Sequence, residues 1–119
     1  MIAKRKHKYG AIPTEVDGIR FASKAEAKRY GELKLLERAG LLKDLKLQPK
    51  FICGVWRPVK PGAMKPISIG TYIADFEYYD IERKEIVVED VKGMKTPLYR
   101  WKKKHVEAQY GITIEEIQR

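Results

Sequence analysis

The hydrophobic and polar positions of the chain follow two periods, and their order predicts the secondary structure. Alternation in "IPTEVDGIRFAS", broken by a turn at Asp17-Gly18, predicts a short hairpin near the N-terminus. Ser23 then offers a helix N-cap, and Glu26 follows three residues later in a segment rich in Ala, Leu, Lys and Glu. These signals, with a glycine at the far end, predict a helix over residues 24–39.

The middle of the chain is expected to be mostly extended. "LKLQPKFICGVW" predicts an extended segment that Pro49 confines to a sheet edge or a bend. "RPVKPGAMKP", residues 57–66, carries three prolines and a glycine and predicts a loop. "ISIGTYIADFEYYD", residues 67–80, alternates in its side chains and predicts one continuous strand.

The last third of the chain predicts a strand, a helix and a final strand. "KEIVVEDVK" is expected to pair with the preceding strand through a turn at residues 82–84. Thr96 followed by Pro97 starts a helix that runs to Tyr110, and "ITIEEI" supplies the last strand. After the N-terminal hairpin the order is therefore helix, three strands, helix, strand, which predicts an α/β fold with a mixed layer of strands.

The size of the chain limits it to one core. With 119 residues, of which 44% are hydrophobic, it is expected to form a single domain over residues 1–119, with a basic N-terminal arm at residues 1–10. Cys53 is the only cysteine, so no intrachain disulfide is expected. No apolar run approaches the roughly 20 residues that span a bilayer, which predicts a soluble, cytoplasmic protein without a membrane partner.

A net charge of +9 favours nucleic acid as the partner. Two basic runs hold much of this charge, and tyrosine or tryptophan stands beside each, an arrangement suited to phosphates and exposed bases. The first run is equally compatible with an ordinary solvated surface, whereas the position of the second run just after the acidic strand favours phosphate binding. The candidate DNA-binding residues are Lys4, Arg5, Lys6 and Lys8 in the first run and Arg100, Lys102, Lys103 and Lys104 in the second.

The strand around "VVEDVKG" ends in charge, which a buried strand does not need. Residues two apart share a face, so Asp90 and Lys92 point to one side and Glu89 to the other. A hairpin turning at 82–84 brings Asp75 opposite Asp90 or nearby. Two neighbouring carboxylates repel unless a cation joins them, and Mg²⁺ commonly binds one or two carboxylates. Lys92 beside them is able to orient a water molecule or neutralise charge on a phosphate.

Two further residues are candidates for the same metal shell. Glu26 fits a capping box with Ser23, yet it also lies on the edge of the apolar stripe formed by Tyr30 and Leu33, where a buried acid needs a partner. Both interpretations of Glu26 stay open. The backbone carbonyl of Val91 points sideways within the sheet, where it is able to complete a metal shell.

"ADF" at residues 74–76, followed by "EDVKG" at residues 89–93, resembles the PD-(D/E)XK nuclease signature, with Ala74 at the position of the motif's proline. The expected element order is similar to the αβββαβ core of that superfamily. The fuller pattern "KYGAIPTEVDGIRFASKAEAKRYGELKLLERAG…LQPKF…YIADFEY…VVEDVKG" is similar to a family of small phage proteins regarded as predicted endonucleases. It covers nearly the whole chain.

The resemblance implies a restriction-endonuclease-like α/β fold, with a mixed central sheet flanked by helices, and it implies a role for each motif residue. Asp75 and Asp90 would be metal-binding catalytic acids, Lys92 the catalytic lysine, and Glu26 a further acid and ligand from the first helix. Gln48 occupies a position where some relatives place a supporting polar residue.

The predicted function is that of a Mg²⁺-dependent DNA endonuclease, with Mn²⁺ able to replace Mg²⁺, that acts inside the host cell of a phage. Small phage proteins with this core often resemble Holliday-junction resolvases, which implies branched DNA as the substrate and a homodimer as the active form. Two alternatives remain: a non-catalytic DNA-binding accessory protein, and a nicking or end-directed nuclease on duplex DNA.

Overall fold

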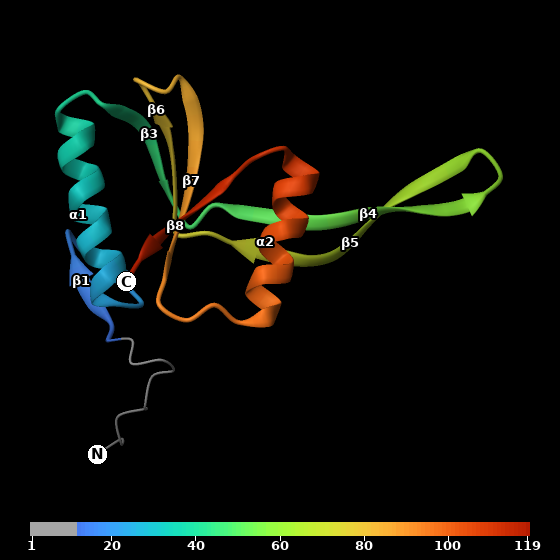
Figure 1. The fold of residues 1–119 in the computed structure, drawn as a ribbon, viewed down its shortest axis with the longest axis horizontal. Coiled ribbons are helices and arrows are strands. Elements are labelled where there is room, and N and C mark those ends of the chain that lie inside the picture. The colour runs from blue at the N-terminus through green and yellow to red at the C-terminus, as the bar shows by residue number, and fades with distance from the viewer. Residues whose placement is uncertain (1–11) are drawn as a thin grey trace, which may run out of the picture.

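The computed structural model describes residues 12–119, so the predicted basic arm with Lys4, Arg5, Lys6 and Lys8 lies outside the described residues. Within this range the chain forms two helices and eight strands (Figure 1). In chain order they are β1 (Thr14–Val16), β2 (Ile19–Phe21), α1 (Lys24–Arg38), β3 (Leu42–Leu47), β4 (Lys50–Lys60), β5 (Ala63–Ile73), β6 (Phe76–Asp80), β7 (Glu85–Lys92), α2 (Pro97–Tyr110) and β8 (Ile114–Gln118).

A mixed sheet in the order β3-β6-β7-β8 forms the centre of the fold. Strands β3, β6 and β7 are antiparallel neighbours, and β8 returns parallel to β7 after the helix α2. Apart from the hairpins β1–β2 and β4–β5, the order along the chain is helix, three strands, helix, strand. The predicted α/β class with a mixed sheet is therefore confirmed.

The two faces of this sheet carry separate cores, because neighbouring residues of β7 point in opposite directions. Val87 and Val91 pack toward α1 and the β1–β2 hairpin, together with Phe76 and Leu33. Val88 belongs to a second cluster on the face of α2. Figure 1 shows α1 on one side of the sheet and α2 on the other. From Val87 to Val91 the strand β7 is thus buried on both faces.

Local sequence signals account for the ends of both helices. The Oγ of Ser23 accepts a hydrogen bond from the Glu26 N–H at 3.1 Å, which starts α1 as predicted. The Oγ1 of Thr96 accepts from the Tyr99 N–H at 3.1 Å and starts α2. Gly111 ends α2 with a left-handed φ of 66°, a conformation that costs glycine little.

The prediction of a loop at residues 57–66 is wrong. Strand β4 continues to Lys60 and β5 starts at Ala63, so that only Pro61 and Gly62 turn the chain. A two-stranded ribbon has no central strand, so prolines are tolerated in it at positions that need no ladder hydrogen bond. The ribbon β4–β5 forms a sheet of its own and extends as a long arm from the body of the protein (Figure 1).

The prediction of one strand over residues 67–80 is also wrong. The chain leaves the arm at Ile73, bends at Ala74 and Asp75, and enters the central sheet at Phe76. The bend is held by backbone hydrogen bonds from Ala74 N to Pro49 O at 3.1 Å and from Asp75 N to Glu89 O at 3.1 Å. None of the helices within residues 12–119 is long and apolar enough to cross a membrane.

Candidate functional site

The structure brings Asp75 and Asp90 together, as the hairpin register predicted. Phe76 pairs with Glu89, so the next positions along the two strands place Asp75 beside Asp90. Burial and the nearby Asp90 carboxylate together raise the pKa of the Asp75 carboxyl group, and the Oδ2 of Asp75 accepts a hydrogen bond from the Val91 N–H at 2.7 Å. The bend between β5 and β6 therefore turns the Asp75 carboxyl group back onto β7.

Asp90 is held from the α2 side of the sheet. Its side chain is almost fully buried, and Oδ2 accepts a hydrogen bond from the hydroxyl of Tyr72 at the base of the arm. The ammonium group of Lys92 lies 3.3 Å from the Oδ1 of Asp90, and it also lies 4.4 Å from the centre of the Tyr99 ring. A fixed carboxylate and a fixed ammonium group thus stand side by side at the end of β7.

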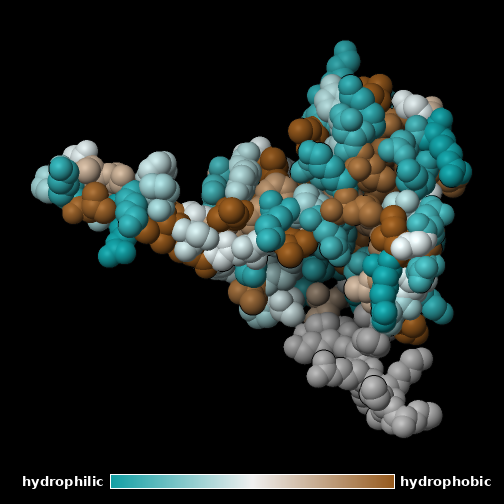
Figure 2. Space-filling model, turned by 180° about the vertical axis from the view of Figure 1, so that it is seen from behind, coloured by the Kyte–Doolittle hydropathy of each residue, from teal (hydrophilic) through white to brown (hydrophobic). Residues whose placement is uncertain are grey.

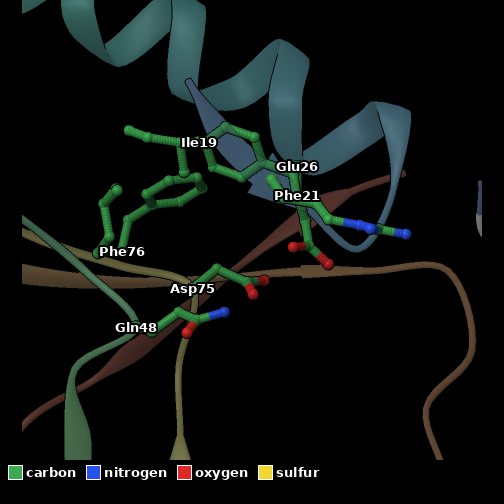
Figure 3. Close-up of a pocket in the computed structure, with 8 residues that line it drawn as sticks. Ile19, Phe21, Glu26, Gln48, Asp75 and Phe76 are labelled. Atoms are coloured by element: carbon green, nitrogen blue, oxygen red, sulfur yellow. The ribbon is translucent and has the colours of Figure 1, made fainter. Parts of the chain in front are cut away.

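Glu26 faces the same place from α1. It lines a pocket of about 130 Å³ together with Asp75, Gln48 and Phe76. Figure 3 shows the Glu26 carboxyl group directed from the helix toward Asp75, with Gln48 on the other side of Asp75. The backbone N–H of Gln48 donates to the carbonyl of Asp75 at 2.9 Å, and Gln48 has a left-handed φ of 52°. The first turn of α1 and the end of β3 therefore form the walls of this pocket.

The two interpretations of Glu26 are compatible in the structure. Its backbone N–H donates to the Oγ of Ser23, and the backbone at Ala22 lowers the pKa of its carboxyl group against the larger effect of burial, so the residue belongs to the start of the helix. The charges of Asp90 and Lys92 nevertheless act on the pKa of the same carboxyl group: Asp90 raises it and Lys92 lowers it. Capping does not prevent it from facing the pocket.

The crowding of acids changes their proton affinity. Burial raises the pKa of Asp75 to about 8, with further contributions in the same direction from the hydrogen bond to Asp90 and from the charges of Asp90 and Glu26. Burial also raises the pKa of Glu26 above its usual range. Two adjacent carboxyl groups that share a proton are typical of a place where a cation is able to replace that proton.

This pKa shift predicts how stability depends on pH without metal. Because the folded-state pKa of Asp75 is raised, the folded protein binds more protons than the unfolded chain between the usual value of 3.8 and about 8. The free energy of unfolding therefore falls as the pH rises through that window and Asp75 loses its proton. Asp75→Asn removes this loss. In chelator at pH 8.5 the variant should therefore unfold at a higher urea concentration than wild type, with a free energy of unfolding about 1–3 kcal/mol larger.

Urea titrations of wild type and Asp75→Asn at pH 5 and pH 8.5 check this prediction. Glu82→Gln, an exposed change in the turn between β6 and β7, serves as the control and should follow the wild-type pH dependence. Parallel pH curves for wild type and Asp75→Asn would contradict the assigned pKa shift.

The donor set fits a hard divalent cation in part. The carboxyl groups of Asp75 and Asp90 are already adjacent, and the backbone of Val91 lies beside them in β7. Within residues 12–119, however, no group of three or more His, Cys, Asp or Glu side chains is close enough to hold a metal ion. Because Mg²⁺ is commonly bound by one or two carboxylates with water and phosphate completing its shell, two acids suffice.

Glu89 lies on the opposite face of β7, as strand parity predicted, and it is fully engaged there. Arg29 of α1 donates from Nε to Oε1 at 2.7 Å and from Nη2 to Oε2 at 2.6 Å, and the hydroxyl of Tyr78 donates to the same carboxylate. The hydrogen bond with Glu89 raises the pKa of Arg29. Glu89 therefore joins α1 to the sheet and is not part of the Asp75–Asp90 pair.

The basic residues of α2 divide into two groups. The Nζ of Lys102 donates to the Thr71 carbonyl at 2.9 Å, and Lys103 lies 3.5 Å from a carboxylate oxygen of Glu116. Arg100 and Lys104 are exposed. The first two lysines thus have partners within the protein, and the exposed pair is better placed for phosphate.

The sequence interpretation missed two residues that hold the site, Tyr72 and Tyr99. It also missed Arg29, which joins α1 to the central sheet. A tyrosine in a core has a hydroxyl group that needs a partner, and this was the available signal for Tyr72 and Tyr99. For Arg29 the sequence offered no such signal, because the partner is 60 residues away in the chain.

Comparison with known proteins identifies the family without adding a function. No curated protein and no solved structure matches the chain. A family model described as "Protein of unknown function (DUF1064)" matches residues 6–117. The match includes every residue of the Asp75–Asp90 site and of the arm, and the chain therefore belongs to the DUF1064 family.

Proposed function

We propose that the protein is a Mg²⁺-dependent DNA endonuclease of the PD-(D/E)XK type. The observation that carries the proposal is the contact between Asp75 and Asp90, with Lys92 at 3.3 Å from Asp90, at the end of a buried strand. The order of helix, three strands, helix, strand around this site supports the restriction-endonuclease-like αβββαβ core. The net charge of +9 supports DNA as the substrate.

Asp75 and Asp90 would hold the cation directly, with the carbonyl of Val91 as a further ligand. Within residues 12–119 Glu26 forms no three-acid cluster with them, so its carboxylate would reach the cation through a coordinated water. When bound, Mg²⁺ would lower the pKa of a coordinated water and stabilise the charge that develops on the scissile phosphate. Mn²⁺, which also prefers oxygen ligands, should replace it.

The side chains around the two acids would contribute by holding charged groups in fixed positions. Lys92 carries a fixed positive charge that is able to donate to a phosphate oxygen or to orient the attacking water. The ring of Tyr99 holds this ammonium group from one side, and the hydroxyl of Tyr72 fixes the orientation of the Asp90 carboxylate. Because these partners are already in place, little reorganisation is needed when DNA binds.

Branched DNA is the proposed substrate, with a homodimer as the active form, since two sites are needed to cut two strands symmetrically. The test is one gel that compares a four-way junction, a flap, continuous duplex and single strand, each with Mg²⁺, with Mn²⁺ and with chelator. We expect cleavage of the junction in either metal and none in chelator. Preferred cutting of duplex ends or single nicks would instead indicate a nicking or end-directed nuclease.

A non-catalytic DNA-binding protein is the second candidate. It is favoured by the fact that Asp90 already has Tyr72 and Lys92 as partners, so the acids are satisfied without a metal ion. This candidate predicts salt-sensitive binding on the same gel and no cleavage of any substrate in either metal.

A further inference from the structure

The arm β4–β5 has an unusual charge composition. Residues 50–73 contain no aspartate or glutamate, and all four of their charged side chains are basic: Lys50, Arg57, Lys60 and Lys65. The chain as a whole has 16 acidic residues, so this segment of 24 positions is selectively free of negative charge. A surface of this kind attracts polyanions along its whole length.

Strand register gives the outer arm two different faces. Trp56 pairs with Pro66 and Pro58 pairs with Met64, so these four residues share one face, which is apolar. Arg57 pairs with Lys65 on the opposite face. Trp56 is 66% exposed and Met64 is 54% exposed.

Seen from behind in Figure 2, hydrophobic and hydrophilic groups follow one another along the arm, and nothing from the rest of the described chain covers its outer part. The arm thus presents an aromatic ring on one side and paired cations on the other. Single-strand and branch-binding surfaces combine these two features, because rings stack on bases and cations bind phosphates.

Helix α2 fixes the base of the arm. Lys102 binds the carbonyl of Thr71, and Tyr110 donates from its hydroxyl to the Ile52 carbonyl at 2.8 Å. Gln109 accepts from the Gly54 N–H at 2.8 Å. The exposed residues of the outer arm begin directly after these contacts, so α2 fixes the base of the arm and nothing within residues 12–119 covers its outer half.

The arm is also joined to the candidate site. Tyr72, near the end of β5, donates to Asp90, and Asp75 follows β5 by two residues. The same strand therefore carries the free arm at one end and leads into the two acids at the other. A nucleic acid bound along the arm would be directed toward those acids.

We propose that β4–β5 is a DNA-binding arm that recognises exposed bases: the Trp56 face stacks on bases that are unpaired or unstacked, and the opposite Arg57–Lys65 face binds phosphates of a neighbouring strand. This inference rests on the proposed function, since it takes DNA as the substrate. A second copy of this chain is a poorer occupant of the apolar face, because pairing two arms would bring eight cations together without a single acid on either arm.

The test measures binding of labelled DNA to the full chain by fluorescence anisotropy, in chelator, over a range of salt concentrations. The DNAs are a four-way junction, a duplex with a single-stranded gap, and a continuous duplex. Arg57→Ala with Lys65→Ala should weaken binding to all three by about 10-fold or more and reduce the salt slope by about 2. Trp56→Ala should weaken junction and gap binding by about 5- to 50-fold and affect duplex much less.

Matched controls come from α1 and from the same position. Lys28→Ala with Arg38→Ala removes two exposed cations far from the arm and should leave the affinities within about 2-fold. Trp56→Phe keeps a ring for stacking and should recover most of the loss. Unchanged thermal unfolding of each variant verifies that the body stays folded.

Three results would contradict the proposed DNA-binding role of the arm. One is wild-type affinity in the Trp56→Ala and Arg57/Lys65 variants. Another is an equal loss on continuous duplex in Trp56→Ala. The third is a change from dimer to monomer in light scattering with unchanged DNA affinity, which would assign the face to a second copy. A wild-type protein that binds none of the DNAs would overturn the proposed function as well. DNA binding by wild type that the arm substitutions leave unchanged would overturn only the proposed role of the arm.

Discussion

Asp90→Asn and Lys92→Ala are each expected to lower the single-turnover rate of DNA cleavage by about 1,000-fold or more, while the affinity for DNA changes by less than about 3-fold. Asp90 is buried between Asp75, Tyr72 and Lys92, so an amide there removes one of the two acids without opening the surface. Lys92 supplies the fixed cation nearest to the acids. Neither change removes a residue of the arm or an exposed cation of α2.

The measurement combines a single-turnover cleavage assay in Mg²⁺ with an anisotropy titration of the same DNA in chelator. Glu82→Gln and Lys28→Ala are the controls, since each makes the same kind of change at an exposed position away from the site. Both should cleave at the wild-type rate. Full cleavage by either site variant would show that the acids and Lys92 have a structural role.

Arg29→Ala is expected to cost about 3–5 kcal/mol of unfolding free energy, the largest effect on stability of any single change considered. The side chain of Glu89 is 0% exposed and that of Arg29 only 19% exposed, and their bidentate pair joins α1 to the central sheet. Removing Arg29 leaves the Glu89 carboxylate buried, with only the Tyr78 hydroxyl to balance it. Uncompensated buried charge is far more costly than a missing surface ion pair.

Urea denaturation at pH 7 measures this cost. Glu32→Ala also removes a partner of Arg29, but on the exposed side, and should cost less than about 1 kcal/mol. Arg29→Met, Glu89→Leu and Tyr78→Phe combined replace the whole polar group with apolar side chains and should restore most of the stability. A loss below about 1 kcal/mol for Arg29→Ala would contradict the structural role of the pair.

The parts of the fold that were predictable from the sequence are those set by neighbouring residues. The turn at Asp17-Gly18, the cap at Ser23 and the Thr96-Pro97 start of α2 act over three or four positions, and all three are confirmed. The contact between Asp75 and Asp90 also followed from local information, because one short turn at residues 82–84 sets the register of β6 against β7.

The arm was not predictable in the same way. Pro58, Pro61 and Pro66 are typical of a loop, and they exclude a central strand but not a free ribbon with two edges. The bend at Ala74 was hidden because the side-chain alternation of the arm continues in phase into β6. Whether one strand or two produce that alternation depends on tertiary contacts, such as the hydrogen bond from Ala74 to Pro49.

Strand parity correctly separated Glu89 from Asp90, but it did not identify what either residue contacts. Arg29 reaches Glu89 across 60 positions of sequence, and Tyr72 reaches Asp90 from a strand that lies outside the central sheet. Such partners depend on how α1 and the arm pack against the sheet. Patterns along a single chain do not encode that arrangement directly.

The most direct test of the nuclease proposal is metal reversal on one labelled four-way junction. Wild-type protein is incubated with the junction in chelator, an excess of Mg²⁺ is then added, and the strands are resolved on a denaturing gel over time. The proposal predicts intact DNA in chelator and discrete cleavage products after Mg²⁺, with no products when Asp90→Asn is treated identically. Intact DNA after addition of Mg²⁺, in a sample that demonstrably binds the junction, would contradict it.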